Sequence, residues 1–173
     1  MRRAIFRVVF LLLLLFLSLP LSSQANDPQS FTGKVVGISD GDTISVMCGD
    51  WVVIVRLYGI DCPKLGQPFG KWAEKFTSNL TLGKEVEVRV RDTDMYGRII
   101  GEVILPNGKN LSHELVMVGM AWWDRKHFPN YSILGALEWL AQVGRLGLWV
   151  DENCVPPWEW GQGNRRPSEF RDI

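Results

Sequence analysis

Short segments with the pattern of β-strands, joined by tight polar turns, limit the fold of this chain more than any other feature. Residues 31–38 alternate between apolar and polar, 43–47 continue as a strand, and 51–58 form a long β-rich run. Gly- and Asp-rich turns separate these segments at 39–42 and 48–50. A period of two is typical of strands with one buried face, and tight turns join antiparallel neighbours. This part of the chain therefore predicts a three-stranded meander.

The next hundred residues combine helices with further strands. Apolar residues at helical spacing predict a helix over 70–82, and alternation predicts a fourth strand over 85–90. A fifth strand is expected over 98–105, between the turn at 92–97 and the turn at 106–108. Two more helices are expected over 111–118 and 132–146. Five strands with a helix between the third and the fourth follow the order of an OB-type barrel. We therefore predict a mainly β fold with helices (α+β), a five-stranded OB-fold barrel with three helices.

The first 25 residues differ from the rest of the chain. Three arginines precede an apolar run over 8–21, and Ser-Gln-Ala at 23–25 offers a small-residue cleavage site. These are the three parts of a secretory signal peptide. The run of about 14 residues is short for a membrane span, which needs roughly 20. Cleavage is favoured over an uncleaved membrane anchor, so we expect a secreted or periplasmic protein with no membrane span after cleavage.

Three regions follow: a signal peptide over 1–25, a barrel domain over 31–150, and a Pro- and Trp-rich segment with a polar tail over 151–173. The first region holds three of the 19 basic residues and none of the 19 acidic ones, so the remainder has a formal net charge of −3. This balance excludes nucleic-acid binding by bulk charge. Attraction for nucleic acid must be local or carried by a metal ion.

The cysteines define neither a zinc site nor a disulfide pairing. Their spacing resembles no zinc motif. Export permits disulfides, and an odd count leaves one thiol unpaired or pairing between chains. The sequence leaves open which of Cys48, Cys62 and Cys154 pair, if any.

Two acid-rich turns carry the residues best suited to chemistry. Asp40 and Asp42 lie between the first two expected strands, and Asp61 follows the third. In a closed meander, strand ends can lie beside their neighbours, so Asp42 and Asp61 could share one hard cation through oxygen ligands. Arg56 and Arg98 could flank that ion and hold a phosphate. An Asp-Gly-Asp turn alone more often caps a bend than binds a metal, so these residues carry weight only in combination.

Several ordered motifs extend around these residues. They are Val36–Thr43 (VGISDGDT), Val55–Pro63 (VRLYGIDCP), Gly66–Gly70 (GQPFG), Asp92–Arg98 (DTDMYGR), Leu115–Trp122 (LVMVGMAW), Gly147–Trp149 (GLW) and Pro156–Trp160 (PPWEW). In this order and spacing they resemble the motifs of staphylococcal-nuclease-like (thermonuclease) domains. The resemblance covers about residues 31–160, nearly the whole chain after the leader.

The resemblance implies an OB barrel with three helices that hydrolyses phosphodiester bonds of DNA and RNA with one calcium ion. It places Asp42 and Asp61 as carboxylate calcium ligands and Asp40 as a supporting acid. It gives Cys62 the role of supplying a backbone carbonyl to the metal, which any side chain permits. The implied partners are DNA and/or RNA as substrate, with no stable protein partner and a monomeric protein.

The same resemblance assigns the contacts to phosphate and nucleotide. Arg56 and Arg98 match the two phosphate-binding arginines, and Tyr96 matches a residue that lines the nucleotide pocket. In-line attack of water on phosphorus is the implied reaction, with the arginines stabilising charge that grows on the phosphoryl group.

One position departs from the family pattern. Lys64 stands where the family has a glutamate that orients or deprotonates the attacking water. An ammonium group cannot accept a proton, and general-base help is worth about 10²–10⁴-fold in rate. Two functions remain open: a weakened calcium-dependent nuclease, or a non-catalytic module that binds nucleic acid or another phosphate compound. A structural or protein-binding module is a third, which has no need of the Asp and Arg positions.

Overall fold

The computed structural model describes residues 29–161; the expected signal peptide over 1–25 and residues 162–173 lie outside this range. Five strands close into a barrel in the order β1-β2-β3-β6-β5. Neighbouring strands are antiparallel except β3 and β6, which are parallel. The barrel strands are β1 Ser30–Asp40, β2 Thr43–Cys48, β3 Trp51–Leu57, β5 Glu85–Thr93 and β6 Ile99–Ile104. The predicted five-stranded OB-type barrel is confirmed.

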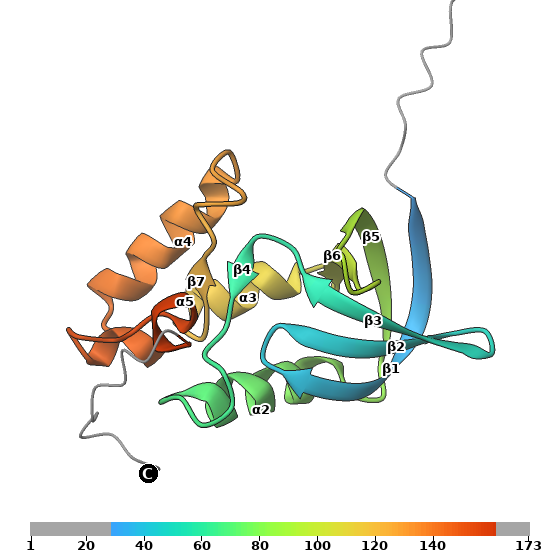
Figure 1. The fold of residues 1–173 in the computed structure, drawn as a ribbon, viewed down its shortest axis with the longest axis horizontal. Coiled ribbons are helices and arrows are strands. Elements are labelled where there is room, and N and C mark those ends of the chain that lie inside the picture. Colours follow the sequence, from blue (N-terminus) through green and yellow to red (C-terminus); the bar gives the residue numbers. More distant parts are fainter. Residues whose placement is uncertain (1–28, 162–173) are drawn as a thin grey trace, which may run out of the picture.

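The three predicted helices are present, and two short helical segments follow them. Figure 1 shows the barrel at one side of the molecule and the C-terminal helices at the other, with α3 between them. The helices are α2 Gly70–Thr81, α3 Leu111–Met117, α4 Ser132–Val143, the 3-10 helix η1 Gly147–Val150 and α5 Pro157–Trp160. Helix α4 ends three residues before its predicted end, because Gly144 and then Arg145, with a positive φ of 50°, redirect the chain.

A second, two-stranded sheet was not predicted. Strand β4 (Ile60–Asp61) pairs antiparallel with β7 (Trp122–Trp123). Two-residue strands carry no periodic pattern, so sequence analysis could not detect them. This small sheet ties the segment after β3 to the helical half of the molecule.

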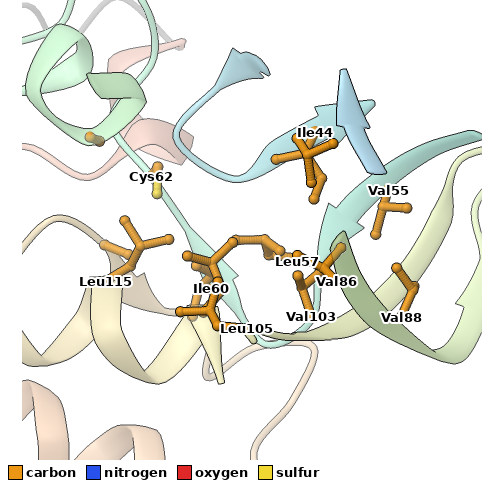
Figure 2. Packing of buried hydrophobic residues seen from close by; sticks show 14 of the residues in the cluster. Ile44, Val55, Leu57, Ile60, Cys62, Val86, Val88, Val103, Leu105 and Leu115 are labelled. Carbon is orange, nitrogen blue, oxygen red and sulfur yellow. The ribbon is translucent and has the colours of Figure 1, made fainter. Parts of the chain in front are cut away.

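The hydrophobic core fills the barrel and continues under α3. Figure 2 shows side chains from β2, β3, β5 and β6 meeting inside the barrel, with Leu105 and Leu115 extending the cluster. Trp122 is buried and makes edge contacts with Trp149 and Trp158, at centroid distances of 6.1 Å and 6.4 Å. These contacts hold the C-terminal segment against the domain.

The structure shows the state of the three cysteines and the length of the helices. Cys48, Cys62 and Cys154 are all free thiols, so none of them pairs within the chain. Within the described residues, no helix combines the length and apolar composition that crossing a bilayer requires.

Packing at the barrel–helix junction generates a stability prediction. Leu115 is completely buried, whereas Leu140 on α4 is half exposed. Leu115→Ala should lower the free energy of unfolding by about 2–5 kcal/mol, because it removes buried methyl groups and leaves a cavity. Leu140→Ala makes the same chemical change at the surface and should stay within about 0.5 kcal/mol of the parent. Urea unfolding of both variants measures the difference, and equal losses would contradict this assignment of the core.

Candidate functional site

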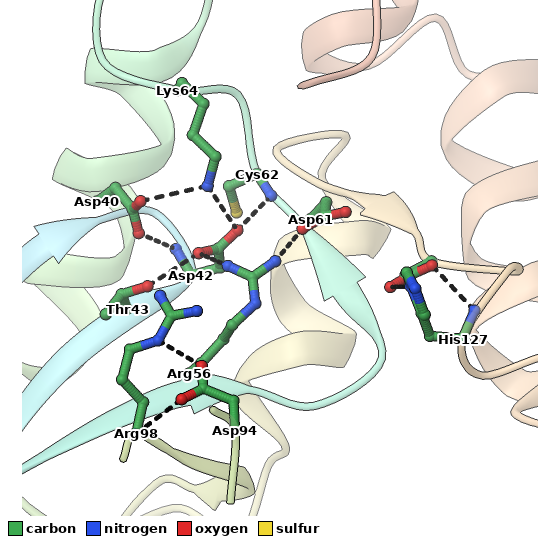
Figure 3. Close-up of polar contacts among 11 residues, drawn as sticks. Asp40, Asp42, Thr43, Arg56, Asp61, Cys62, Lys64, Asp94, Arg98 and His127 are labelled. Carbon is green, nitrogen blue, oxygen red and sulfur yellow. Dashed lines mark hydrogen bonds and ion pairs between the residues drawn. The ribbon is translucent and has the colours of Figure 1, made fainter. Parts of the chain in front are cut away.

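The carboxylate of Asp42 lies at the centre of the polar cluster shown in Figure 3. It is fully buried at the turn between β1 and β2. The Thr43 hydroxyl donates to its Oδ1 at 3.0 Å, and the backbone N–H of Cys62 donates to its Oδ2 at 2.7 Å. Arg56 Nη1 donates to the same Oδ1 at 2.7 Å. Asp42 therefore joins the β1–β2 turn to β3 and to the segment after β4.

Gly41 explains why this turn has an Asp-Gly-Asp sequence. A Cβ atom at Gly41 would lie 2.7 Å from the Cβ of Ala73 and 2.8 Å from that of Cys62. The Thr77 hydroxyl of α2 donates to the Gly41 carbonyl at 2.6 Å. Only a residue without a side chain allows the turn to pack this closely against α2, and this contact sets the position of Asp42.

Arg56 connects the two carboxylates that the resemblance assigns to calcium. It faces Thr43 across the β2–β3 pair, and its guanidinium contacts both Asp42 and Asp61. Asp61 is held in place by the pairing of β4 with β7, opposite Trp122. The structure thus brings these three predicted site residues together from the β1–β2 turn, β3 and β4.

Lys64 points into the cluster. Its Nζ lies 3.4 Å from Asp40 Oδ2 and 3.9 Å from Asp42 Oδ2, and its side chain is 43% exposed. Gln67 fixes the loop: the Lys64 backbone N–H donates to Gln67 Oε1 at 3.0 Å, and Gln67 Nε2 donates to the Val155 carbonyl at 2.5 Å. At the position of the family glutamate, the chain therefore places a cation against two carboxylates.

Arg98 and Tyr96 form a separate group at the start of β6. The guanidinium of Arg98 is paired with Asp94, with Nε 2.7 Å from Oδ2. The Arg98 guanidinium also lies 5.7 Å from the centroid of the Tyr96 ring, which is 76% exposed. Because Ile99, the first residue of β6, pairs with Val55, Arg98 precedes β6 beside the end of β3 that carries Arg56. Asp94 thus accepts a hydrogen bond from Nε of Arg98.

Sequence analysis gave no individual role to several residues that build the cluster. Thr43, Thr77 and Gln67 position the acids and the Lys64 loop through the hydrogen bonds described above. Thr43 lies inside the Val36–Thr43 motif, and Gln67 lies inside Gly66–Gly70, so the motifs marked them without showing what they bond. Nothing in the local sequence marked Thr77.

Burial dominates the electrostatics of the cluster. It raises the pKa of Asp42 to about 6, although the neighbouring Arg56 opposes this. Burial also raises the pKa of Asp61, again against Arg56. The pKa of Asp40 is lowered: burial opposes the shift, but hydrogen bonding with Asp42 and the charge of Lys64 outweigh it. The buried carboxylates are therefore incompletely neutralised by their own cationic partners.

The chemistry of this cluster suits a hard divalent cation. Asp40, Asp42 and Asp61 offer carboxylate oxygens, the donors that calcium prefers, and among residues 29–161 the cations in ion pairs with them are Arg56 and Lys64. Between residues 29 and 161, no three His, Cys, Asp or Glu side chains converge as ligands on one point. The donor chemistry thus fits a cation, while Arg56 and Lys64 occupy the carboxylates in this arrangement.

The raised pKa of Asp42 predicts a pH dependence of stability. An Asp side chain in the unfolded chain has a pKa of about 3.9. Between pH 4 and 6 the folded protein therefore binds more protons than the unfolded chain. Stability must then fall as pH rises through this range. With a chelator present, raising the pH from 4 to 7 should lower the free energy of unfolding of the parent. The decrease should be roughly 1–3 kcal/mol larger in the parent than in Asp42→Asn.

Urea unfolding at several pH values provides the measurement. Asp50→Asn is the matched control, because Asp50 is exposed in the β2–β3 turn and should leave the parent profile unchanged. Parallel profiles for the parent and Asp42→Asn would contradict the raised pKa.

Comparisons with known proteins agree with this geometry. An Escherichia coli protein named uncharacterized endonuclease is 39% identical over 128 residues, covering 74% of this chain and 83% of its own. The micrococcal nuclease of Shigella flexneri is 37% identical over 147 residues, covering 80% and 84%. An uncharacterized endonuclease of Haemophilus influenzae is 35% identical over 150 residues, covering 86% and 81%.

A family model matches the chain as well. The model described as staphylococcal nuclease homologue matches residues 54–151, from within β3 to the end of η1. This range includes Arg56, Asp61, Lys64 and Arg98. Together with the closed five-stranded barrel, these matches show that the chain belongs to the staphylococcal nuclease homologue family.

Proposed function

We propose that this protein is an exported, calcium-dependent nuclease that hydrolyses phosphodiester bonds in DNA, RNA or both. One observation carries the proposal: Asp42 in the β1–β2 turn and Asp61 on β4 share the guanidinium of Arg56 in a largely buried cluster. A structural barrel has no need of charges buried at this cost. Family membership and relatives named as endonucleases support nuclease activity.

Asp42, Asp61 and the backbone carbonyl of Cys62 are the proposed calcium ligands, with Asp40 in support. The contact between the Cys62 N–H and Asp42 places this part of the backbone beside the acids already. A bound calcium ion would supply charge that polarises a phosphate oxygen and an attacking water. The raised pKa values of Asp42 and Asp61 are consistent with a cluster that gains from an additional cation.

Arg56 and Arg98 are proposed to bind the phosphate undergoing attack. Both guanidinium groups are held by carboxylates, Arg56 by Asp42 and Asp61, and Arg98 by Asp94. A phosphate oxygen can replace a carboxylate oxygen on the same N–H groups, because both match the planar guanidinium fork. The arginines then stabilise negative charge that grows in the transition state. Tyr96, exposed beside Arg98, is proposed to line the nucleotide site.

Lys64 reduces the expected rate in two ways. Its ammonium cannot take a proton from water, so the chain lacks the base that the family has at this position. It also neutralises Asp40 and Asp42, which lowers their attraction for a divalent cation. The same contacts favour the second candidate function, a module that binds nucleic acid or phosphate without cutting it. In that case Lys64 and Arg56 would hold the phosphate.

Localisation and assembly complete the proposal. The basic and apolar leader supports export to the periplasm or medium after cleavage, with an uncleaved membrane anchor as the alternative. We propose a monomer, because one chain contains every residue assigned to the site.

A cleavage assay on residues 26–173 tests the catalytic proposal. Single-stranded DNA and RNA are incubated with calcium or with chelator. The parent should cleave only with calcium, and Asp42→Ala should lose at least about 10²-fold in rate because the cluster loses its central ligand. Lys64→Glu should raise the rate by about 10–10⁴-fold, since it restores a base and removes a competing cation.

Each result of this assay separates the candidate functions. Glu74→Gln is the control, because Glu74 lies on α2 and has no proposed part in the reaction. An inert parent that gains activity in Lys64→Glu indicates a binding protein built on a competent site. Inertness of both proteins would overturn the catalytic proposal.

Calcium affinity provides a test that does not depend on turnover. Because the Lys64 ammonium lies beside Asp40 and Asp42, Lys64→Ala should strengthen calcium binding by roughly 3–30-fold, with solvent screening limiting the gain. Titration calorimetry measures the affinity. Lys75→Ala removes an exposed charge from α2 and should leave it unchanged. Equal affinities of parent and Lys64→Ala would show that the ammonium does not compete with the ion.

A further inference from the structure

A pocket of about 360 Å³ lies beside the candidate site, and none of the residues assigned to calcium or phosphate lines it. It opens between the turn after β3, the strands β5 and β6, and the loop that leads into α4. The residues that matter for its chemistry are Tyr58, Arg91, Glu102, His127, Phe128 and Tyr131.

Aromatic rings form much of the pocket wall. The ring of Tyr58 lies 4.3 Å from that of Phe128 and 5.4 Å from that of Tyr131, measured between centroids. The three side chains are partly buried, so they are held in place yet keep part of their surface at the pocket. Such walls suit a flat ligand, since aromatic rings stack favourably on one another.

A fixed carboxylate supplies the polar end of the pocket. Glu102 is buried, and its Oε1 accepts from the Tyr131 hydroxyl at 3.2 Å and lies 3.1 Å from Arg91 Nη2. The Tyr131 hydroxyl is in turn 2.8 Å from His113 Nε2. Both of these contacts use Oε1, and a carboxylate can accept further hydrogen bonds, for example from a ligand N–H. A flat ring with N–H donors at its edge matches this combination.

Charge at the pocket favours a ligand that also carries a phosphate. The Arg91 guanidinium lies 5.9 Å from the centroid of the Tyr58 ring, and its side chain is partly exposed. Arginine binds phosphate oxygens readily while stacking on an aromatic ring. The pocket therefore offers ring faces, an acceptor for N–H groups and a cation.

The turn after β3 connects this pocket to the candidate site. Tyr58 precedes Asp61 by three residues, a separation of at most about 10 Å along the chain. Between them, Gly59 adopts a positive φ of 83°, and a Cβ there would lie 2.8 Å from the Tyr131 ring. The backbone N–H of Asp124 donates to the Gly59 carbonyl, while its carboxylate contacts His127. The pocket and the acidic cluster thus share one rigid turn.

We propose that this pocket binds one unstacked nucleobase of a single-stranded nucleic acid, in a nucleotide close to the phosphate that Arg56 and Arg98 are proposed to bind. The inference rests on the proposed function and adds a substrate preference to it. A base in a duplex is stacked and paired, so it cannot enter the pocket without leaving the helix. A single strand presents its bases freely to aromatic side chains.

Binding of labelled oligonucleotides to the full chain tests this inference. Fluorescence anisotropy is measured in chelator, so that no cleavage occurs, with single-stranded DNA and with the matching duplex. Tyr58→Leu and Phe128→Leu keep apolar volume but remove one ring each. Each should weaken single-strand binding by about 5–100-fold, the usual value of one base–aromatic stack, and change duplex binding by less than about twofold. Trp139→Leu, an exposed aromatic on α4, is the control and should bind like the parent.

A second measurement keeps the test decisive if a variant fails to fold. An oligonucleotide with one 2-aminopurine should lose fluorescence on binding the parent, because the base stacks on a ring in the pocket. The loss should disappear in whichever of the two variants retains the parent's circular dichroism and melting profile. Unchanged single-strand affinity and unchanged quenching in a folded variant would overturn the inference.

The outcome is separable from that of the catalytic proposal. If the parent cleaves with calcium and both pocket variants bind single strands normally, the nuclease proposal is supported and the base pocket is contradicted. If the parent binds single strands through Tyr58 and Phe128 but does not cleave them, the base pocket is supported and the catalytic proposal is contradicted. A parent that binds no single strand contradicts the pocket directly.

Discussion

Burial of the Asp42 carboxylate is the constraint on which the rest of the site depends. A carboxylate removed from water is stable only with strong partners, and Asp42 obtains them from Thr43, Cys62 and Arg56. These partners belong to different segments, so satisfying one charge fixes the β1–β2 turn, the end of β3 and the start of the loop after β4 relative to one another. Gly41 makes this possible by letting the turn pack against α2. The group best placed to bind a cation is therefore also a structural centre of the domain.

The same constraint gives a physical account of Lys64. Three carboxylates gather here, and Arg56 contacts two of them, Asp42 and Asp61, while leaving Asp40 to other partners. An ammonium at 3.4 Å from Asp40 reduces this excess of negative charge without an external ion. A glutamate at position 64 would instead bring a fourth carboxylate to the cluster, which is favourable only when a metal ion is present. The lysine thus balances the metal-free cluster, and by the same charge it would oppose the proposed binding of a metal ion and the abstraction of a proton.

The barrel was predictable from sequence because its strands are β-rich and its turns are short. Asp42, Arg56 and Asp61 could be singled out because they stand in recognisable motifs, but the contacts among them could not be predicted. That Arg56 spans both acids depends on the register that places it opposite Thr43, and that Arg98 pairs with Asp94 depends on the local turn. The strands β4 and β7 were missed because two residues show no period. The pocket was missed because its members lie far apart in sequence and meet only through tertiary packing.

The turn between Tyr58 and Asp61 joins the two halves of the proposed substrate site. Its first residue supplies an aromatic ring to the pocket and its last supplies a carboxylate to the cluster. Gly59 permits the close approach of Tyr131, and the pairing of β4 with β7 fixes Asp61 beside Trp122. A base bound at one end therefore determines where its neighbouring phosphate can lie at the other. In a protein with a lysine in place of the base at position 64, such positioning becomes a larger part of any remaining rate, because it lowers the entropic cost of reaching the reactive geometry.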